Sequence, residues 1–281
     1  MELDTKSHPG WVVQTVTVSE ALDLIHKPAP AINSHSDEET ARANNPGDHR
    51  HRWAGVDCGD LLAAKDWPKG RELVAKYSCQ LAGLPQATSI VRRRRWSEDG
   101  DEFSRDRLDA GYAECWSSRK RVTQQRESGV LKLTVNIGGS ASHPAHELAW
   151  IGAAACVLVD RLEDAGYRVE FEVVSGSDRM YATLNRKNLL VMPVKRAGDP
   201  LDLDTALMAC SSPWFFRVHL FRVWCEQPWE VTTGKGYLEP APAWAKGDIH
   251  LEAVYSLADA QAQLGEILKR FGKEGDMQCV A

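Results

Sequence analysis

Four consecutive arginines followed by a tryptophan are the residues of this chain whose types most directly suggest a chemistry. Guanidinium groups pair with phosphates through two parallel hydrogen bonds, and an indole ring can stack on a base. We therefore predict that this stretch contacts nucleic acid or another anionic partner through Arg92, Arg93, Arg94, Arg95, Trp96, Arg119, Lys120 and Arg121, with Trp116 as a second stacking residue. The alternative is a solvated hairpin face, neutralised by acidic residues that lie close in sequence: Glu98, Asp99, Asp101, Glu102, Asp106 and Asp109.

The glycine- and serine-containing loop at 136–142 is the second stretch whose residue types suit a binding or catalytic site. Backbone amides at Gly138 and Gly139, just before a helix, favour anions, but the loop has no lysine and matches no phosphate-binding motif. Ser140 lies between a strand and a helix as a nucleophile elbow does, although the flanking glycines of G-x-S-x-G are missing. An enzyme would have its site here, at the carboxyl ends of the strands, near Asn136, Ser140, Ser142 and Asp178. The alternative is a tight turn that uses glycine and serine for backbone reasons.

Histidine and cysteine patterns give no clear metal site. His143, His146 and Glu147 form H-x-x-H-E, whereas a zincin requires H-E-x-x-H to place both imidazoles on one helix face. Asp48, His49 and His51 lie in a polar segment that is expected to be solvated. The seven cysteines are scattered without a CxxC spacing, so we expect reduced and mostly buried thiols, with Cys156 in the core.

Residues 131–177 predict the elements that position these side chains. A strand at 131–137, a long apolar helix at 145–165 that stops at Gly166, and a strand at 167–174 form a β-loop-α-β unit. Its crossover requires a parallel strand pair. Further strands at 188–195 and 248–255 alternate with helices at 203–209, 214–226 and 256–271, so we predict an α/β fold with a partly parallel sheet flanked by helices, Rossmann-like in character.

The local composition of the sequence divides the chain into three regions. Residues 1–52 read as an N-terminal arm and flexible linker, with one short helix at 18–25 for which Ser19 is a suitable N-cap. Residues 53–128 read as a small module of two helices, within 57–84, and a charged hairpin. Residues 129–281 carry the α/β domain.

The β-loop-α-β unit resembles a von Willebrand factor A domain, with the segment DRLEDAGYRVEF as helix end and second strand. In that family the loop reads Asp-x-Ser-x-Ser and holds a divalent cation, because a carboxylate and two hydroxyls suit a hard ion. Here Asn136 replaces the aspartate and Gly138 replaces the first serine, while Ser140 matches and Ser142 lies two residues further on. The resemblance therefore implies at most a weak divalent-cation site, at Asn136, Ser140 and Ser142, in a protein otherwise expected to have no cofactor.

Over most of its length the chain is similar to an uncharacterised family of tailed-phage proteins. The similarity rests on Trp53-Ala54-Gly55, Asp60-Leu61-Leu62, Trp67-Pro68-Lys69-Gly70, Gly100-Asp101-Glu102 to Gly111-Tyr112, Glu114-Cys115-Trp116, Gly152 to Glu170, Leu201-Asp202-Leu203 and Ser212-Pro213-Trp214 to Glu226. This similarity implies a viral origin and the α/β fold, but it implies no particular activity.

Composition limits the functional classes. The chain has 281 residues, of which 43% are hydrophobic and 26% charged, as in ordinary globular proteins. No apolar run is long enough for a membrane span, and the first residues lack the apolar core of a signal peptide, so we expect the host cytoplasm or a virion and no membrane partner. The first hypothesis is a non-catalytic phage protein that acts through protein–protein contacts in assembly, in the virion or in host takeover; the alternatives are a nucleic-acid-binding accessory protein and an enzyme.

Overall fold

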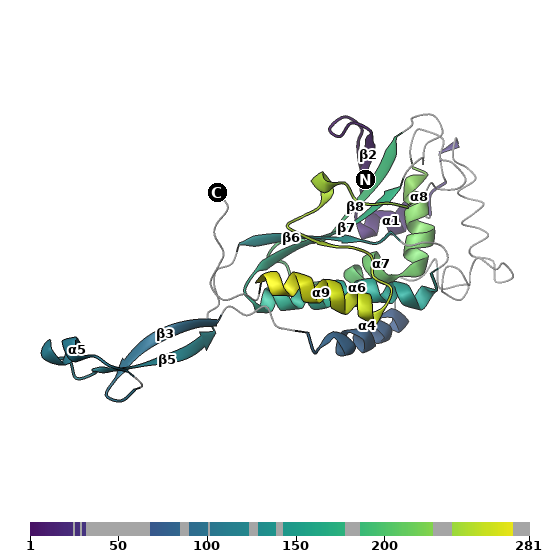
Figure 1. The fold of residues 1–281 in the computed structure, drawn as a ribbon. Helices are drawn as coiled ribbons and strands as arrows, with labels where there is room; N and C mark the ends of the chain where they lie inside the picture. Colours follow the sequence, from purple (N-terminus) through teal and green to yellow (C-terminus); the bar gives the residue numbers. More distant parts are fainter. Residues whose placement is uncertain are drawn as a thin grey trace.

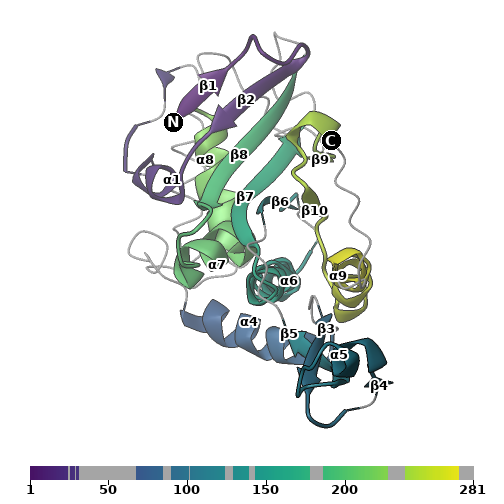
Figure 2. The ribbon, with the colours of Figure 1, turned by 90° about the vertical axis from the view of Figure 1, so that its left-hand side faces the viewer.

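A mixed β-sheet with helices packed against it forms the body of the protein (Figures 1 and 2). The computed structural model describes residues 1–24, 26–28, 30–31, 68–84, 90–100, 102–123, 129–138, 143–177, 186–226 and 238–271, and for 68–69, 90–95, 118–123, 145 and 238–239 it describes the backbone alone. The strand order is β1-β2-β8-β7-β6-β10, with the short β9 (Leu238–Glu239) paired to β7. The predicted α/β class with a partly parallel sheet is therefore confirmed.

The predicted β-loop-α-β unit is present. β6 (Val130–Asn136) pairs in parallel with β7 (Arg168–Ser177), and α6 (Ala145–Asp164) connects them. Gly166 ends the helix as predicted, because its φ of 93° is a left-handed conformation that other residues rarely adopt. The amide of Tyr167 then donates to the carbonyl of Leu162 at 3.0 Å, which completes a Schellman-type cap.

The N-terminal residues belong to the sheet, although no strand is predicted there from the sequence. β1 (Glu2–Asp4) is antiparallel to β2 (Trp11–Thr15), and β2 is parallel to β8 (Lys187–Lys195), with Val12 opposite Asn188. β2 is only five residues long and its partner lies far along the chain, so no local pattern marks it. These residues are therefore structural strands and not part of an arm.

The first helix, α1 (Val18–Leu24), was predicted, but its cap was not. The helix begins one residue before Ser19, so Thr17 is the N-cap. The amide of Glu20 donates to the Thr17 hydroxyl at 3.2 Å, and the amide of Thr17 donates to the Glu20 carboxylate at 2.9 Å. This reciprocal pair is a capping box, which satisfies two amides that a helix start leaves open.

Alternating side chains direct one face of the sheet toward the helices. Leu133 and Val135 of β6 and Phe171 and Val173 of β7 are buried in the main core. The same core includes Ile249 and Leu251 of β10 (Ile249–Leu251), which pairs in parallel with β6. Its helical side comes from α6 and α1, and from α7 (Leu203–Ser211) and α9 (Leu257–Phe271). The intervening residues of each strand, such as Thr134 and His250, face the other side of the sheet.

A second helical layer lies beyond α6. α4 (Pro68–Leu81) falls within the predicted 57–84 segment, whose residues 57–67 lie outside the described part of the chain. The ring of Tyr77 stacks on that of Trp150 in α6, with centroids 3.9 Å apart. Val74, Tyr77 and Leu81 join the main core, so α4 covers α6 from outside (Figure 1).

The aromatic segment after α7, predicted as a helix at 214–226, lies in the core but is not one regular helix. Phe215–Leu220 forms a π-helix, η2, which continues into α8 (Phe221–Trp224). Trp214, Phe215 and Trp224 are almost completely buried. Asp202 caps α7, since its carboxylate accepts a hydrogen bond from the amide of Asp204 at 3.1 Å.

The face of the sheet opposite the helices is covered in part by a short strap. Ala241, and Ala245 of the 3-10 helix η3 (Ala243–Ala245), pack with Val174 and Leu189 in a small second core. Trp244 stacks on His8 with ring centroids 3.5 Å apart, which joins the strap to the N-terminal hairpin.

Described cysteines fit the predicted role of buried thiols. Cys115, Cys156, Cys210 and Cys225 are buried, whereas Cys79 is exposed. Burial raises the pKa of Cys156 to about 12, and the nearby Asp160 adds to this shift. In the described ranges no helix has the length and apolar character to cross a membrane.

Residues 90–123 form an arm that projects from the body (Figure 1). β3 (Ile90–Ser97) and β5 (Trp116–Thr123) run antiparallel, while β4 (Glu102–Phe103) and α5 (Arg105–Asp109) lie at the far end. We call the β3–β5 ribbon the shaft and residues 97–115 the tip. The predicted charged hairpin thus exists as an extended structure.

Candidate functional site

The shaft brings the two predicted basic runs together. In the β3–β5 register, Arg92 lies opposite Arg121, Arg93 opposite Lys120 and Arg94 opposite Arg119. Seven basic residues and no acidic residue thus occupy the two strands. Like charges directly opposite each other destabilise a strand pair, so this register is not explained by the stability of the hairpin.

Neutralisation by the acidic residues of the hairpin was the alternative interpretation. Those residues follow Ser97, beyond the end of the strand, whereas the cross-strand neighbours of Arg92, Arg93 and Arg94 are themselves basic. Most basic positions of the arm therefore lie in the shaft and most acidic ones in the tip, while Glu102 of β4 lies beside Ser117 of β5, so neutralisation by the hairpin stays the alternative prediction.

Trp96 and Trp116, the predicted stacking residues, lie where the shaft meets the tip. The guanidinium carbon of Arg107 lies 4.4 Å from the ring centroid of Trp96 and 4.4 Å from that of Tyr112. Phe103 packs on Trp116 with centroids 5.0 Å apart, and both rings remain partly exposed. Trp116 is thus the more accessible of the two indoles for a partner.

The loop after β6 is held by hydrogen bonds that the sequence did not reveal. The Asn136 side-chain carbonyl accepts from the amide of Gly138 at 2.9 Å, as in an Asx turn, and its amide donates to Glu252 at 2.9 Å. The hydroxyl of Tyr255 donates to the Gly138 carbonyl at 2.5 Å, and its ring stacks on His143. Ser140, Ser142 and Asp178 lie outside the described residues, so the cation site and the enzyme site remain predictions.

The H-x-x-H-E segment forms a local pair. His143 Nδ1 lies 2.8 Å from Glu147 Oε2, one helical turn away, and the carbonyl of His143 accepts from Arg217 at 2.7 Å. His146 is exposed, and its carbonyl accepts a long hydrogen bond from Tyr77 at 3.5 Å. Within the described part of the chain, no group of three or more His, Cys, Asp or Glu side chains is arranged to hold a metal ion.

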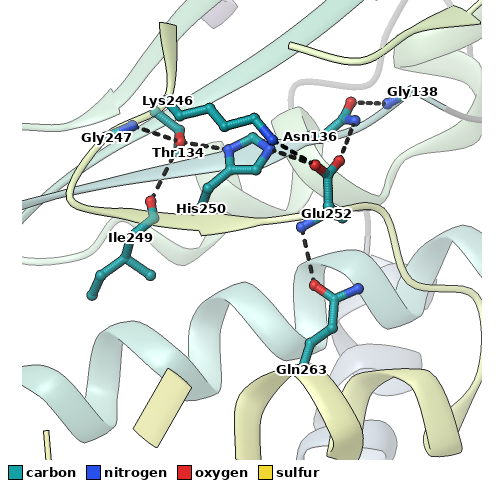
Figure 3. Close-up of polar contacts among 9 residues, drawn as sticks. All are labelled: Thr134, Asn136, Gly138, Lys246, Gly247, Ile249, His250, Glu252 and Gln263. Atoms are coloured by element: carbon teal, nitrogen blue, oxygen red, sulfur yellow. Dashed lines mark hydrogen bonds and ion pairs between the residues drawn. The ribbon is translucent and has the colours of Figure 1, made fainter. Parts of the chain in front are cut away.

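A polar cluster lies where β6 meets the edge strand β10, on the sheet face opposite the helices (Figure 3). Glu252 is its centre: one carboxylate oxygen accepts from Asn136, and the other lies 3.0 Å from Lys246 Nζ and 3.1 Å from His250 Nε2. On the far side of the imidazole, His250 Nδ1 lies 2.7 Å from the Thr134 hydroxyl. We call these five residues the sheet-face cluster: Thr134, Asn136, Lys246, His250 and Glu252.

Distances assign the protons within the cluster. The Thr134 hydroxyl is closer to His250 Nδ1 than to the Ile249 carbonyl at 3.3 Å, so we assign its proton to Nδ1 and the imidazole proton to Nε2, which faces Glu252. Burial lowers the pKa of His250, and Lys246 contributes, although the Glu252 carboxylate opposes the shift. Burial would raise the pKa of Glu252, but hydrogen bonds from Asn136 and Lys246 outweigh it and lower that pKa.

Hydroxyl, imidazole and carboxylate in a row resemble a hydrolytic triad, but the geometry does not suit a nucleophile. Thr134 is completely buried, and its hydroxyl also accepts from the amide of Gly247 at 3.1 Å. A substrate carbonyl cannot reach a hydroxyl that is buried within the sheet face. The cluster instead fastens β10 and the 246–247 turn to β6.

Sequence reasoning missed His250, Glu252 and Lys246. The alternation in 248–255 did indicate that 248, 250 and 252 share a face. It could not indicate that this face lies against Thr134 and Asn136, because the parallel β6–β10 pairing joins residues more than a hundred positions apart in the chain, as in the 116-residue separation of Thr134 and His250.

Comparison with known proteins adds a family and nothing more. No curated protein and no solved structure matches the chain. The similarities to von Willebrand A domains and to tailed-phage proteins therefore stay predictions. One family model matches residues 17–275, which is most of the chain, and the protein therefore belongs to the family described as Domain of unknown function (DUF7192).

Proposed function

We propose that the protein binds nucleic acid through the shaft of its arm, without catalysis by the arm. The observation that carries this proposal is the cross-strand register, which places Arg92, Arg93 and Arg94 opposite Arg121, Lys120 and Arg119. Phosphates between these cations would remove the repulsion that the register creates. A two-stranded ribbon also has dimensions that the major groove of B-DNA admits.

The formal net charge of −5 for the whole chain does not oppose this role. β3 has eight residues, which corresponds to roughly 27 Å of extended strand. Arg94 and Arg95 lie four and five residues from Ile90, roughly 13–17 Å along the strand, which exceeds the Debye length of about 8 Å at physiological salt, so the negative charge of the body is largely screened at these positions. A local basic surface is what non-specific binding requires.

Binding is expected to be largely independent of sequence. Successive positions of a strand alternate between the two faces of a ribbon, so basic positions fall on both faces of the shaft. Such a distribution favours contacts with phosphates over readout of one set of base edges.

The test is fluorescence anisotropy with a labelled 20-base-pair duplex and the matching single strand, at several salt concentrations. The arm variant is Arg92→Gln, Arg93→Gln, Arg94→Gln. We expect at least roughly tenfold weaker binding near 0.1 M salt, and a plot of log K against log salt whose slope is shallower by about 2 to 3, because three phosphate contacts are lost.

A matched control removes the same charge elsewhere. Lys76, Arg196 and Lys269 are exposed on the body, so their triple exchange to Gln alters net charge equally and leaves the shaft intact. This control should bind like the wild type. Equal losses in both triple variants, or no salt-dependent binding by the wild type, would contradict the proposal.

The protein–protein contact expected from the sequence is supported by a different part of the arm. Its tip exposes aromatic and aliphatic side chains, Phe103 and Leu108 among them. A protein surface suits such side chains better than a phosphate backbone does.

A further inference from the structure

The tip carries an unusual concentration of exposed apolar side chains. Of the nine large hydrophobic residues most exposed in the described ranges, three lie in the tip and a fourth is the first residue of β5, where the shaft meets the tip. They are Phe103 (48% exposed), Leu108 (54%), Tyr112 (55%) and Trp116 (39%). Exposed apolar groups scattered singly are ordinary, whereas a group gathered at the end of a projecting arm marks a contact surface.

The same tip is strongly acidic. Residues 97–115 contain seven acidic and two basic residues, a formal charge of −5, whereas the shaft has seven basic residues and no acidic one. Carboxylates repel phosphates, so nucleic acid does not suit the tip. The surface that complements an acidic, aromatic patch is a basic one, and this chain carries such a surface in its own shaft.

Within one arm, the carboxylates of the tip do not reach all the basic positions of the shaft. β3 and β5 are paired from Ile90 and Thr123 at the base to Ser97 and Trp116 at the far end, and the tip continues from there. β4 pairs only with Trp116 and Ser117, so the tip folds against the distal end of the ribbon. Arg92 and Arg93 lie several residues closer to the body.

We infer that, when no nucleic acid occupies the shaft, the tip docks on the shaft of a second copy, so that two arms pair in antiparallel orientation about a two-fold axis. In that arrangement each tip meets the other shaft, and the two contacts are identical. Self-complementarity of this kind requires that the acidic and basic surfaces be offset along the arm, which is how the chain places them. An isologous pair closes on itself, so a dimer is expected and not a filament.

The arm already shows the chemistry that this contact would use. Arg107 lies over the rings of both Trp96 and Tyr112, at 4.4 Å from each centroid. Guanidinium groups from a neighbouring shaft could stack in the same way on the exposed Phe103–Trp116 pair, while carboxylates of the tip pair with the remaining cations. Attraction between the two patches should weaken as salt rises.

The experiment is sedimentation velocity on the full chain, freed of nucleic acid by nuclease treatment and a high-salt wash, in 50 mM and 500 mM salt. We expect a dimer in 50 mM salt and a shift toward monomer in 500 mM salt. Because no nucleic acid is present, the outcome does not depend on the proposed function.

Two charge-reversal variants make the test specific. The tip variant is Glu98→Lys, Asp109→Lys and the shaft variant is Arg93→Glu, Lys120→Glu; each should raise the dimer dissociation constant at least roughly tenfold, because like charges then face each other. A mixture of the two variants should form a heterodimer again, since both contacts regain opposite charges. Glu72→Lys, Asp199→Lys on the body is the control and should dimerise like the wild type, since both residues are exposed there.

Circular dichroism of each variant checks that the fold is kept. A wild-type chain that is monomeric in 50 mM salt would overturn the inference. So would a dimer that survives both reversals, or variants that fail to associate when mixed although both are folded. Association of the tip with a basic protein alone, and never with this chain, would also count against it.

Discussion

Glu252 shows how one side chain can link separate parts of the sheet edge. It accepts from Asn136 at the end of β6 and pairs with Lys246 from the turn before β10, while its own amide donates to Gln263 of α9 at 3.1 Å. These bonds lower the pKa of the carboxyl group despite the burial that opposes this. A lowered carboxyl pKa means that the folded chain binds its proton less readily than the unfolded chain does.

The sign of the pH effect follows from this difference. Stability from Glu252 is fully present above the ordinary carboxyl pKa of 4.5 and is lost as pH falls through the lower folded-state value. We expect Glu252→Gln to reduce the free energy of unfolding near pH 7 by on the order of 0.5 kcal/mol, since solvent screens a side chain that is 44% exposed. The difference from the wild type should shrink as pH falls below 4.5, measured by urea unfolding across the pH range.

Asp199→Asn provides the control, because Asp199 is an exposed carboxylate in the turn at 198–200. Its difference from the wild type should stay nearly constant over the same range. A Glu252→Gln difference that stays constant, or grows as pH falls, would show that the cluster does not stabilise the charged carboxylate.

His250 adds a second contribution to acid sensitivity. Its pKa is lowered from the ordinary value of 6.5, so the unfolded chain takes up this proton at a higher pH than the folded chain does. Stability from the neutral imidazole is therefore lost as pH falls below 6.5. The two residues of the cluster act in the same direction, at successive pH ranges.

Helix–helix contact between α6 and α7 depends on the absence of a side chain. A Cβ built on Gly152 would lie 1.7 Å from the Ser211 hydroxyl oxygen and 3.0 Å from the Ser211 Cβ. The two helices thus approach more closely than any larger residue allows. Because α6 joins β6 and β7, this contact sets how the helical layer sits on the sheet.

Gly152→Ala is expected to lower the free energy of unfolding by about 1–3 kcal/mol through overpacking, in chemical denaturation. Ser211→Gly in the same chain should recover most of that loss. Gly265→Ala in α9 is the matched control, because nothing lies within 4 Å of the position that a Cβ would take there, and alanine should stabilise that helix by roughly 0.5–1 kcal/mol. Destabilisation of equal size at both glycines would show that close approach to Ser211 is not the cause.

The sequence was most informative where a pattern is local. The α6 helix and its flanking strands were predicted because twenty helical residues and a glycine stop carry their own signal. β2 was missed because five residues gain their structure from β8, and the sheet-face cluster was missed because it needs the β6–β10 pairing. The basic runs were recognised, but only the register shows that they lie opposite each other.

At the scale of the whole molecule, the arm and the body behave as separate structures. β3, β4, α5 and β5 pair or pack with one another, and the arm projects from the body (Figure 1). Ile90 and Thr123 are partners in the register, so the chain enters and leaves the arm at neighbouring points. Residues of the arm can therefore be replaced or removed without interrupting a strand of the main sheet.

Replacement of residues 90–123 by a short Gly/Ser linker tests this separation. The melting temperature should change by no more than a few degrees, because no arm residue whose side chain is described belongs to the main core. Binding to the labelled duplex should be abolished in the same variant. A body that no longer folds cooperatively, as judged by calorimetry, would show that the arm contributes to the core.

The parallel pairing of β2 with β8 has a consequence for synthesis of the protein. Val12 and Asn188 are partners, so β2 has left the ribosome long before its neighbour exists. At about 5–20 residues per second the delay is on the order of 10–35 s. During that time β2 can pair with β1, but the edge that later meets β8 is open. The N-terminal hairpin of β1 and β2, although it is made first, can therefore join the sheet only after β8 has been made.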